Sequence, residues 1–137
     1  MKAEQTSGRT QTFVAILAWW AIVWAVLLAV GEIVRNWDDW QWWPFWLLDF
    51  VASALLLVGA WFALRPNQDK CLSPLVGAFG FCTAGAYGSF FSHLEIMEQP
   101  ISGNIAHGPL TVIIGVLFGL ATLSFLVASV LAVRLGR

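Results

Sequence analysis

Charged side chains are scarce in this sequence. Only 11% of its 137 residues are Asp, Glu, Lys or Arg, whereas 59% are apolar. Soluble domains carry about a quarter charged residues, and a soluble fold of this length could not bury so much hydrocarbon. The net charge of -1 is uninformative about partners, and nothing in the sequence suggests a nucleic-acid partner. The composition excludes a soluble globular protein and indicates a membrane protein.

Residues and motifs typical of catalytic or cofactor-binding sites are equally scarce. The chain has two cysteines and two histidines, and it contains no catalytic triad, phosphate loop or nucleotide fingerprint. About 16 Å of helix rise separates Cys71 from Cys82, which is beyond the reach of a disulfide, so we expect two independent thiols. The sequence leaves open whether any reaction is catalysed. It identifies no cofactor apart from the metal ion considered below.

Four long apolar segments dominate what is present. A helix needs about 20 mainly apolar residues to cross a bilayer, and the segments 12–34, 44–64, 74–97 and 109–133 meet this requirement. The first is not a signal peptide, because its apolar run is longer than the roughly 15 residues of a signal core and no A-x-A-like site follows it. We therefore expect one all-α domain over residues 1–137, an integral membrane protein with a four-transmembrane-helix bundle.

The distribution of basic residues predicts the orientation. Arg35 is the only basic residue on one side of a four-pass topology. The six on the other side are Lys2, Arg9, Arg65, Lys70, Arg134 and Arg137. The positive-inside rule then places both termini in the cytoplasm, with the chain in the cell membrane, or the inner membrane of a Gram-negative cell.

The stretch NWDDWQWWPFW, residues 36–46, holds five of the nine tryptophans beside two aspartates. Tryptophan favours membrane interfaces, because its ring is apolar while its N–H needs a polar partner. We expect an aromatic belt that anchors an acidic outer loop to the bilayer. A ligand-stacking platform and a partner surface are the alternatives. The anchoring residues are Trp37, Trp40, Trp42, Trp43 and Trp46.

Small residues recur at steps of three or four, which places them on one stripe of each helix. The first row runs from Ala15 to Glu32 and the second from Asp49 to Ala63. Small residues let membrane helices approach closely. These rows predict a tight bundle, a homo-oligomer or a contact with another membrane protein. On the last two helices the predicted packing residues are Gly80, Ala84, Gly88, Gly115 and Gly119.

Carboxylates and imidazoles gather at the predicted outer end. Asp49 is the most telling, since it lies about 7 Å into its helix, and ionisable groups inside membrane segments are costly and mark functional sites. Carboxylates with neutral imidazoles suit a metal ion. A site for protons or a quinone-like lipid is a variant of the same hypothesis. The candidate ligands are His93, Glu95, His107, Asp49 and Glu32.

Simpler roles compete with a site at this end. Glu32 could form an ion pair with Arg35 three positions later. Asp49 lies in the second turn of its helix, where the helix dipole lowers the free-energy cost of its negative charge. The stretch HLEIMEQ matches neither the HExxH zinc motif nor the ExxH of di-iron bundles. The favoured interpretation is a non-enzymatic packing, assembly or interaction subunit. The outer acidic and histidine site, serving transport or redox chemistry, is the alternative.

Overall fold

The computed structural model describes residues 2–37, 43–65, 71–97 and 107–135, without the side chains of residues 2–7, 9, 43, 45 and 107. These residues form four α-helices and no strand: α1 (Lys2–Arg35), α2 (Trp43–Leu64), α3 (Ser73–Glu95) and α4 (His107–Leu135). All four are long and apolar enough to cross a membrane. The predicted all-α class and the number of candidate spans are therefore confirmed.

The helix bounds differ from the prediction mainly at α1. This helix begins at Lys2, ten residues before the predicted start at residue 12. Hydropathy detects only the apolar part of a helix, whereas Lys, Glu, Gln and Arg are good helix formers and continue the same helix into polar sequence. α3 ends at Glu95, two residues before the predicted end. The bounds of α2 and α4 agree with the prediction to within two residues.

Proline marks the start of three helices. Pro44, Pro74 and Pro109 all lie in the first turn of their helices. In that turn the missing N–H costs nothing, because no residue of the helix would accept it, and the fixed φ angle of proline suits the helix. Leu72, at the N-cap of α3, makes no side-chain capping hydrogen bond, so proline is the stronger local signal there.

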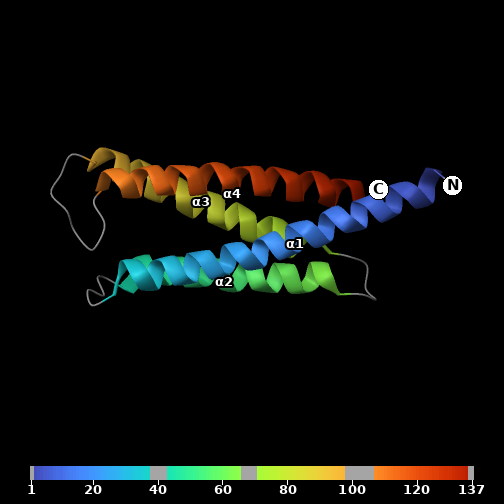
Figure 1. Ribbon diagram of the computed structural model, residues 1–137, viewed down its shortest axis with the longest axis horizontal. Coiled ribbons are helices and arrows are strands. Elements are labelled where there is room, and N and C mark those ends of the chain that lie inside the picture. Colours follow the sequence, from blue (N-terminus) through green and yellow to red (C-terminus); the bar gives the residue numbers. More distant parts are fainter. Residues whose placement is uncertain (1, 38–42, 66–70, 98–106, 136–137) are drawn as a thin grey trace.

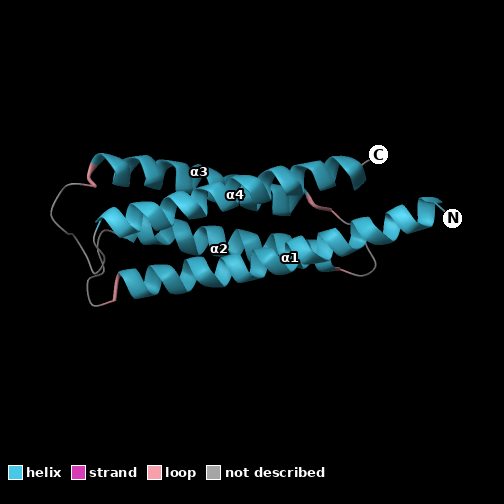
Figure 2. Cartoon of the chain, turned by 45° about the horizontal axis from the view of Figure 1, so that its top comes forward, coloured by secondary structure: helices cyan, strands magenta, loops and turns pink. Residues whose placement is uncertain are grey.

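The helices form two antiparallel hairpins, α1 with α2 and α3 with α4 (Figure 1). α2 also packs along α3, whereas α1 touches α4 only lightly. We call the end where α1 and α3 begin, and where the chain has both termini, the terminal end (Figure 2). The opposite end, where α1 and α3 finish, is the distal end.

Alanine makes up much of the core. On α1 the buried alanines follow the row predicted from the sequence, and so do those on α2. Small side chains on both helices let the two backbones approach closely. The buried alanines of the first hairpin are Ala18, Ala21, Ala25, Ala52, Ala60 and Ala63.

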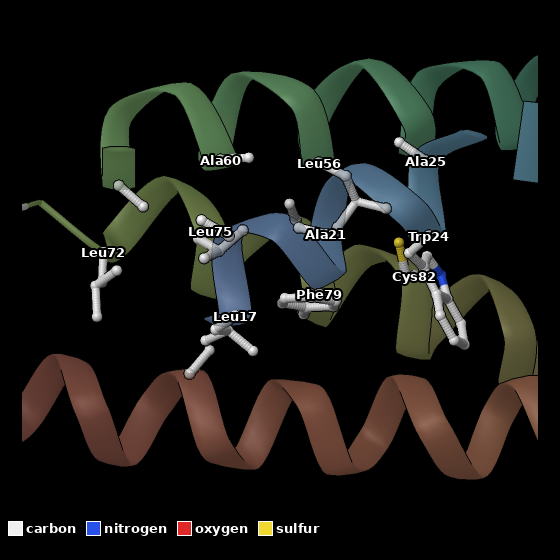
Figure 3. Packing of buried hydrophobic residues seen from close by; sticks show 14 of the residues in the cluster. Leu17, Ala21, Trp24, Ala25, Leu56, Ala60, Leu72, Leu75, Phe79 and Cys82 are labelled. Atoms are coloured by element: carbon white, nitrogen blue, oxygen red, sulfur yellow. The ribbon is translucent and has the colours of Figure 1, made fainter. Parts of the chain in front are cut away.

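A few large side chains fill the space between the hairpins. Leu56 of α2 and Leu75 and Phe79 of α3 are fully buried. Figure 3 shows them beside Trp24 of α1, which lies next to Cys82 of α3. α1, α2 and α3 therefore share one interior.

The backbones of α2 and α3 come close together at Gly59. A Cβ atom at this glycine would lie 2.8 Å from the Cα atom of Leu75. Toward the distal end the same two helices are further apart, since a Cβ at Gly85 would meet only the side chain of Leu48, at 3.4 Å. Of these two positions, the one nearer the terminal end therefore has the closer contact between the hairpins.

A side-chain hydrogen bond between Trp20 and Ser124 joins α1 to α4. Trp20 Nε1 donates to Ser124 Oγ at 2.9 Å, and Ser124 Oγ donates to the Leu120 carbonyl at 2.8 Å. In an apolar environment an indole N–H costs free energy unless it finds an acceptor. This bond gives the lightly packed pair of helices a specific register.

The contact at Gly59 gives a direct test of the fold. We expect Gly59→Ala to lower the free energy of unfolding by about 1–3 kcal/mol, because the added methyl group forces the α2 and α3 backbones apart. Gly31→Ala is the matched control, since nothing lies within 4 Å of a Cβ there. The measurement is reversible unfolding in mixed micelles. Equal stabilities of the two variants would contradict the described contact.

Candidate functional site

Glu32 is a buried acid near the distal end of α1. Its side chain is only 6% exposed. The Asn36 amide donates from Nδ2 to Glu32 Oε1 at 2.7 Å and to the Glu32 carbonyl at 2.8 Å. Arg35 lies on its other side, with a guanidinium nitrogen 4.0 Å from Glu32 Oε2. The predicted pairing of Glu32 with Arg35 is present, and the hydrogen bond from Asn36 is the shorter contact.

Asp49 of α2 lies against Glu32. The two carboxyl groups lie close enough to interact, and the Asp49 side chain is half-buried. One turn deeper, Ser53 Oγ lies 2.8 Å from the Asp49 carbonyl and 2.9 Å from the Ala25 carbonyl, to which it donates across to α1. The first hairpin thus brings two acids 17 positions apart into one site, which we call the acid pair.

The other candidate ligands belong to the second hairpin. His93 is half-buried on α3, and its Nδ1 donates to the Ser89 carbonyl at 2.8 Å. Thr111 of α4 donates to the His93 carbonyl at 3.3 Å. Glu95 is exposed at the end of α3. His107 is the first residue of α4, and its side chain lies outside the described part of the chain.

The structure therefore brings two of the five predicted metal ligands together. Within residues 2–37, 43–65, 71–97 and 107–135, no three side chains of His, Cys, Asp and Glu converge closely enough to hold a metal ion. Among the described side chains, no third metal-ligating residue joins the acid pair. A metal site that includes the histidines stays a prediction.

The tryptophan belt is described in part. Trp37 lies two residues after the end of α1 and is exposed. Trp46, in the first turns of α2, is half-buried and meets Phe50 edge-on, with 5.9 Å between ring centroids. Trp40 and Trp42 lie outside the described residues, as does the side chain of Trp43. Both described rings are at the distal end, where a belt was predicted.

The predicted packing residues of α3 and α4 divide into two groups. A Cβ at Gly80 would lie 3.3 Å from the Phe125 ring, and one at Gly115 would lie 2.9 Å from the Phe90 ring, so these two glycines are covered inside the second hairpin. Ala84, Gly88 and Gly119 are exposed, and a Cβ at either of these two glycines would meet nothing within 4 Å.

One side of α3 therefore presents a row of small residues away from the bundle. Gly77, Ala84 and Gly88 are exposed and spaced by seven and four positions, which keeps them on one line along the helix. Ser92 and Glu95 continue this line to the distal end, and both are exposed. We call these five residues the outward face of α3. Tyr87 and Phe91, exposed rings 4.7 Å apart, lie beside it.

Sequence reasoning missed several polar contacts. Asn36 is four positions after Glu32, a spacing that places both on one side of a helix, and this signal could have been used. The bond between Trp20 and Ser124 joins positions 104 residues apart, and no local pattern indicates it. Trp24 is 2% exposed, and its Nε1 has no hydrogen-bond partner among the described residues.

Comparison with known proteins provides no relative for this chain. No protein family, no curated protein and no solved structure matches it. The functional argument therefore depends on the contacts, burial and composition of the chain itself.

The polar contacts of Glu32 can be tested through Asn36. We expect Asn36→Ala to lower the free energy of unfolding by about 1–3 kcal/mol, because a buried carboxylate loses its closest donor. Thr12→Ala is the control, since the Thr12 hydroxyl bonds to the Gly8 carbonyl on an exposed surface. Unfolding in mixed micelles measures both variants. If Asn36→Ala is as stable as Thr12→Ala, Asn36 does not support Glu32 as described.

Proposed function

We propose that the chain is a multi-pass membrane protein, with both termini in the cytoplasm, that acts as a non-enzymatic packing, assembly or interaction subunit. Four helices long and apolar enough to cross a bilayer support the membrane assignment. Arg65 and Arg134, at the terminal end, agree with a cytoplasmic orientation of that end. The subunit associates with another membrane helix through the outward face of α3.

The exposure of small residues on this face is the observation that carries the proposal. Membrane helices associate by close packing of their backbones, and glycine, alanine and serine at four-residue spacing permit this approach. Ala84, Gly88 and Ser92 have that spacing, and all three are exposed. Inside the second hairpin, a glycine already allows close packing between two helices, since the Phe90 ring of α3 packs directly over Gly115 of α4.

The composition of α3 also favours contact with a protein partner. Of the four candidate spans, α3 has the lowest hydropathy. A helix that faced only lipid would be expected to carry apolar side chains around its exposed surface. Exposed Ser92 and Tyr87 suit contact with protein better than contact with acyl chains. The partner is a helix of a second copy of this chain or of another membrane protein.

A second candidate function rests on the acid pair. Two carboxylates that share a site repel each other, and burial strengthens this repulsion. Arg35, at 4.0 Å, offsets only part of it. A metal ion or a proton held between Glu32 and Asp49 would offset the remainder, and carboxylate oxygens are ordinary ligands of hard cations. This arrangement would serve ion binding or transfer at the distal end.

Association through α3 can be measured between labelled copies in lipid vesicles by energy transfer. We expect Gly88→Ile to weaken self-association by about tenfold, because the larger side chain holds the two backbones apart. Gly31→Ile is the matched control, since this glycine of α1 is also exposed and open. Equal energy transfer in the parent and Gly88→Ile, or none in the parent, would contradict self-association through this face.

The acid pair can be tested by elemental mass spectrometry of protein purified in mild detergent. We expect the parent to carry near-stoichiometric metal and Asp49→Asn to carry little, because the variant removes one of the two carboxylates. Loss of metal in His93→Ala as well would extend the site to the second hairpin. Glu95→Gln, which changes an exposed acid, is the control. A parent protein that carries no metal would contradict the proposal that the acid pair binds a metal ion.

A further inference from the structure

An apolar groove lies between α1 and α4 at the terminal end, outside the acid pair and the outward face of α3. Its volume is about 310 Å³. α1 contributes one lining residue and α4 the others. The lining residues are Phe13, Leu126, Val127, Val130, Leu131 and Arg134.

Among the side chains that the structure describes, the groove has an apolar floor and walls and one cation, Arg134, at one end. Leu131, 8% exposed, belongs to the core, whereas Phe13 and Val130 are mostly exposed. Arg134 follows Val130 by one helical turn, so it lies at the end of the groove nearest the end of α4. Leu126, the lining residue furthest from Arg134, is next to Phe125 and two positions from Ser124, which bonds to Trp20.

The dimensions fit a single hydrocarbon chain. From Leu126 to Arg134 the helix rises about 12 Å, close to the roughly 15 Å of hydrocarbon in one leaflet. The groove is shallow and open to the surface, so a hydrocarbon chain can enter it from the side.

We propose that this groove binds one acyl chain of an anionic phospholipid and that Arg134 binds its phosphate. Charge complementarity supports this occupant, because Arg134 is exposed and forms no ion pair with any side chain that the structure describes. Guanidinium donors match phosphate oxygens in geometry as well as in charge. The positive-inside rule also predicts that the terminal end faces the cytoplasmic leaflet, where anionic lipids concentrate. The site depends on the proposed membrane orientation, but it is independent of the contacts proposed for α3.

Native mass spectrometry of the delipidated, detergent-purified chain tests the proposal. The protein is titrated with phosphatidylglycerol and, separately, with phosphatidylcholine of the same acyl chains. We expect phosphatidylglycerol to bind about fivefold more tightly than phosphatidylcholine. This is the factor by which one basic side chain strengthens binding to an anionic membrane surface. Arg134→Gln should bind both lipids equally. Val130→Trp should bind neither, because the indole fills the groove while the charge stays.

Two control variants separate this site from general effects. Lys70→Gln removes a basic residue of the same predicted side, and Val116→Trp adds an indole to an exposed position of α4 outside the groove. Both should bind lipid like the parent, and inorganic phosphate at matched concentration should not displace the lipid. Circular dichroism checks that each variant is folded. If Val130→Trp does not fold, the lipid preference of Arg134→Gln alone tests the proposal.

Three results would overturn the proposal. The first is a parent that binds both lipids equally, and the second is a folded Arg134→Gln that keeps the preference for phosphatidylglycerol. The third is a folded Val130→Trp that binds lipid as the parent does. Displacement of the lipid by inorganic phosphate would show instead that Arg134 recognises a free anion.

Discussion

The close approach of α2 and α3 at Gly59 is the contact on which the rest of the arrangement depends. α1 packs mainly on α2, and α4 mainly on α3, so the two hairpins are joined principally through α2 and α3. The Leu75 backbone lies so near Gly59 that no side chain can stand between them. In a bilayer, close packing would supply the attraction there, because lipid removes the hydrophobic drive between helices.

Each polar feature then belongs to one hairpin or to a boundary between them. The acid pair forms within the first hairpin, and the hydrogen bonds of His93 form within the second. The Trp20 to Ser124 bond spans the lightly packed boundary between α1 and α4. The outward face of α3 lies away from all of these contacts. The proposed association through α3 and the proposed ion binding at the acid pair would therefore use separate parts of the molecule.

The sequence predicted the helices and several of their buried rows, because both depend on local hydropathy and on spacings of three and four residues. The alanines of α1 and α2 are buried as that spacing indicates. The start of α1 was placed ten residues late, since polar helical turns carry no hydropathy signal.

Contacts between distant segments were the part that sequence could not supply. Hydropathy placed Glu32, Asp49 and His93 at one end of the bundle, but only the packing of helices shows that Asp49 meets Glu32. Similarly, Gly80 and Gly88 have the same residue type and lie on the same helix. One is covered by Phe125 and the other is open, because helical spacing alone does not say which side of α3 receives α4.

The length of α1 has a mechanical consequence. Its 34 residues extend about 51 Å, whereas the hydrocarbon of a bilayer is about 30 Å thick. α2, with 22 residues, extends only about 33 Å beside it, so the first turns of α1 continue past the rest of the bundle (Figure 1). A continuous helix moves as one rigid body. Tilting or rotating α1 inside the bilayer would therefore swing its polar first turns by the same angle, and would carry a motion in the membrane to the aqueous phase without any hinge.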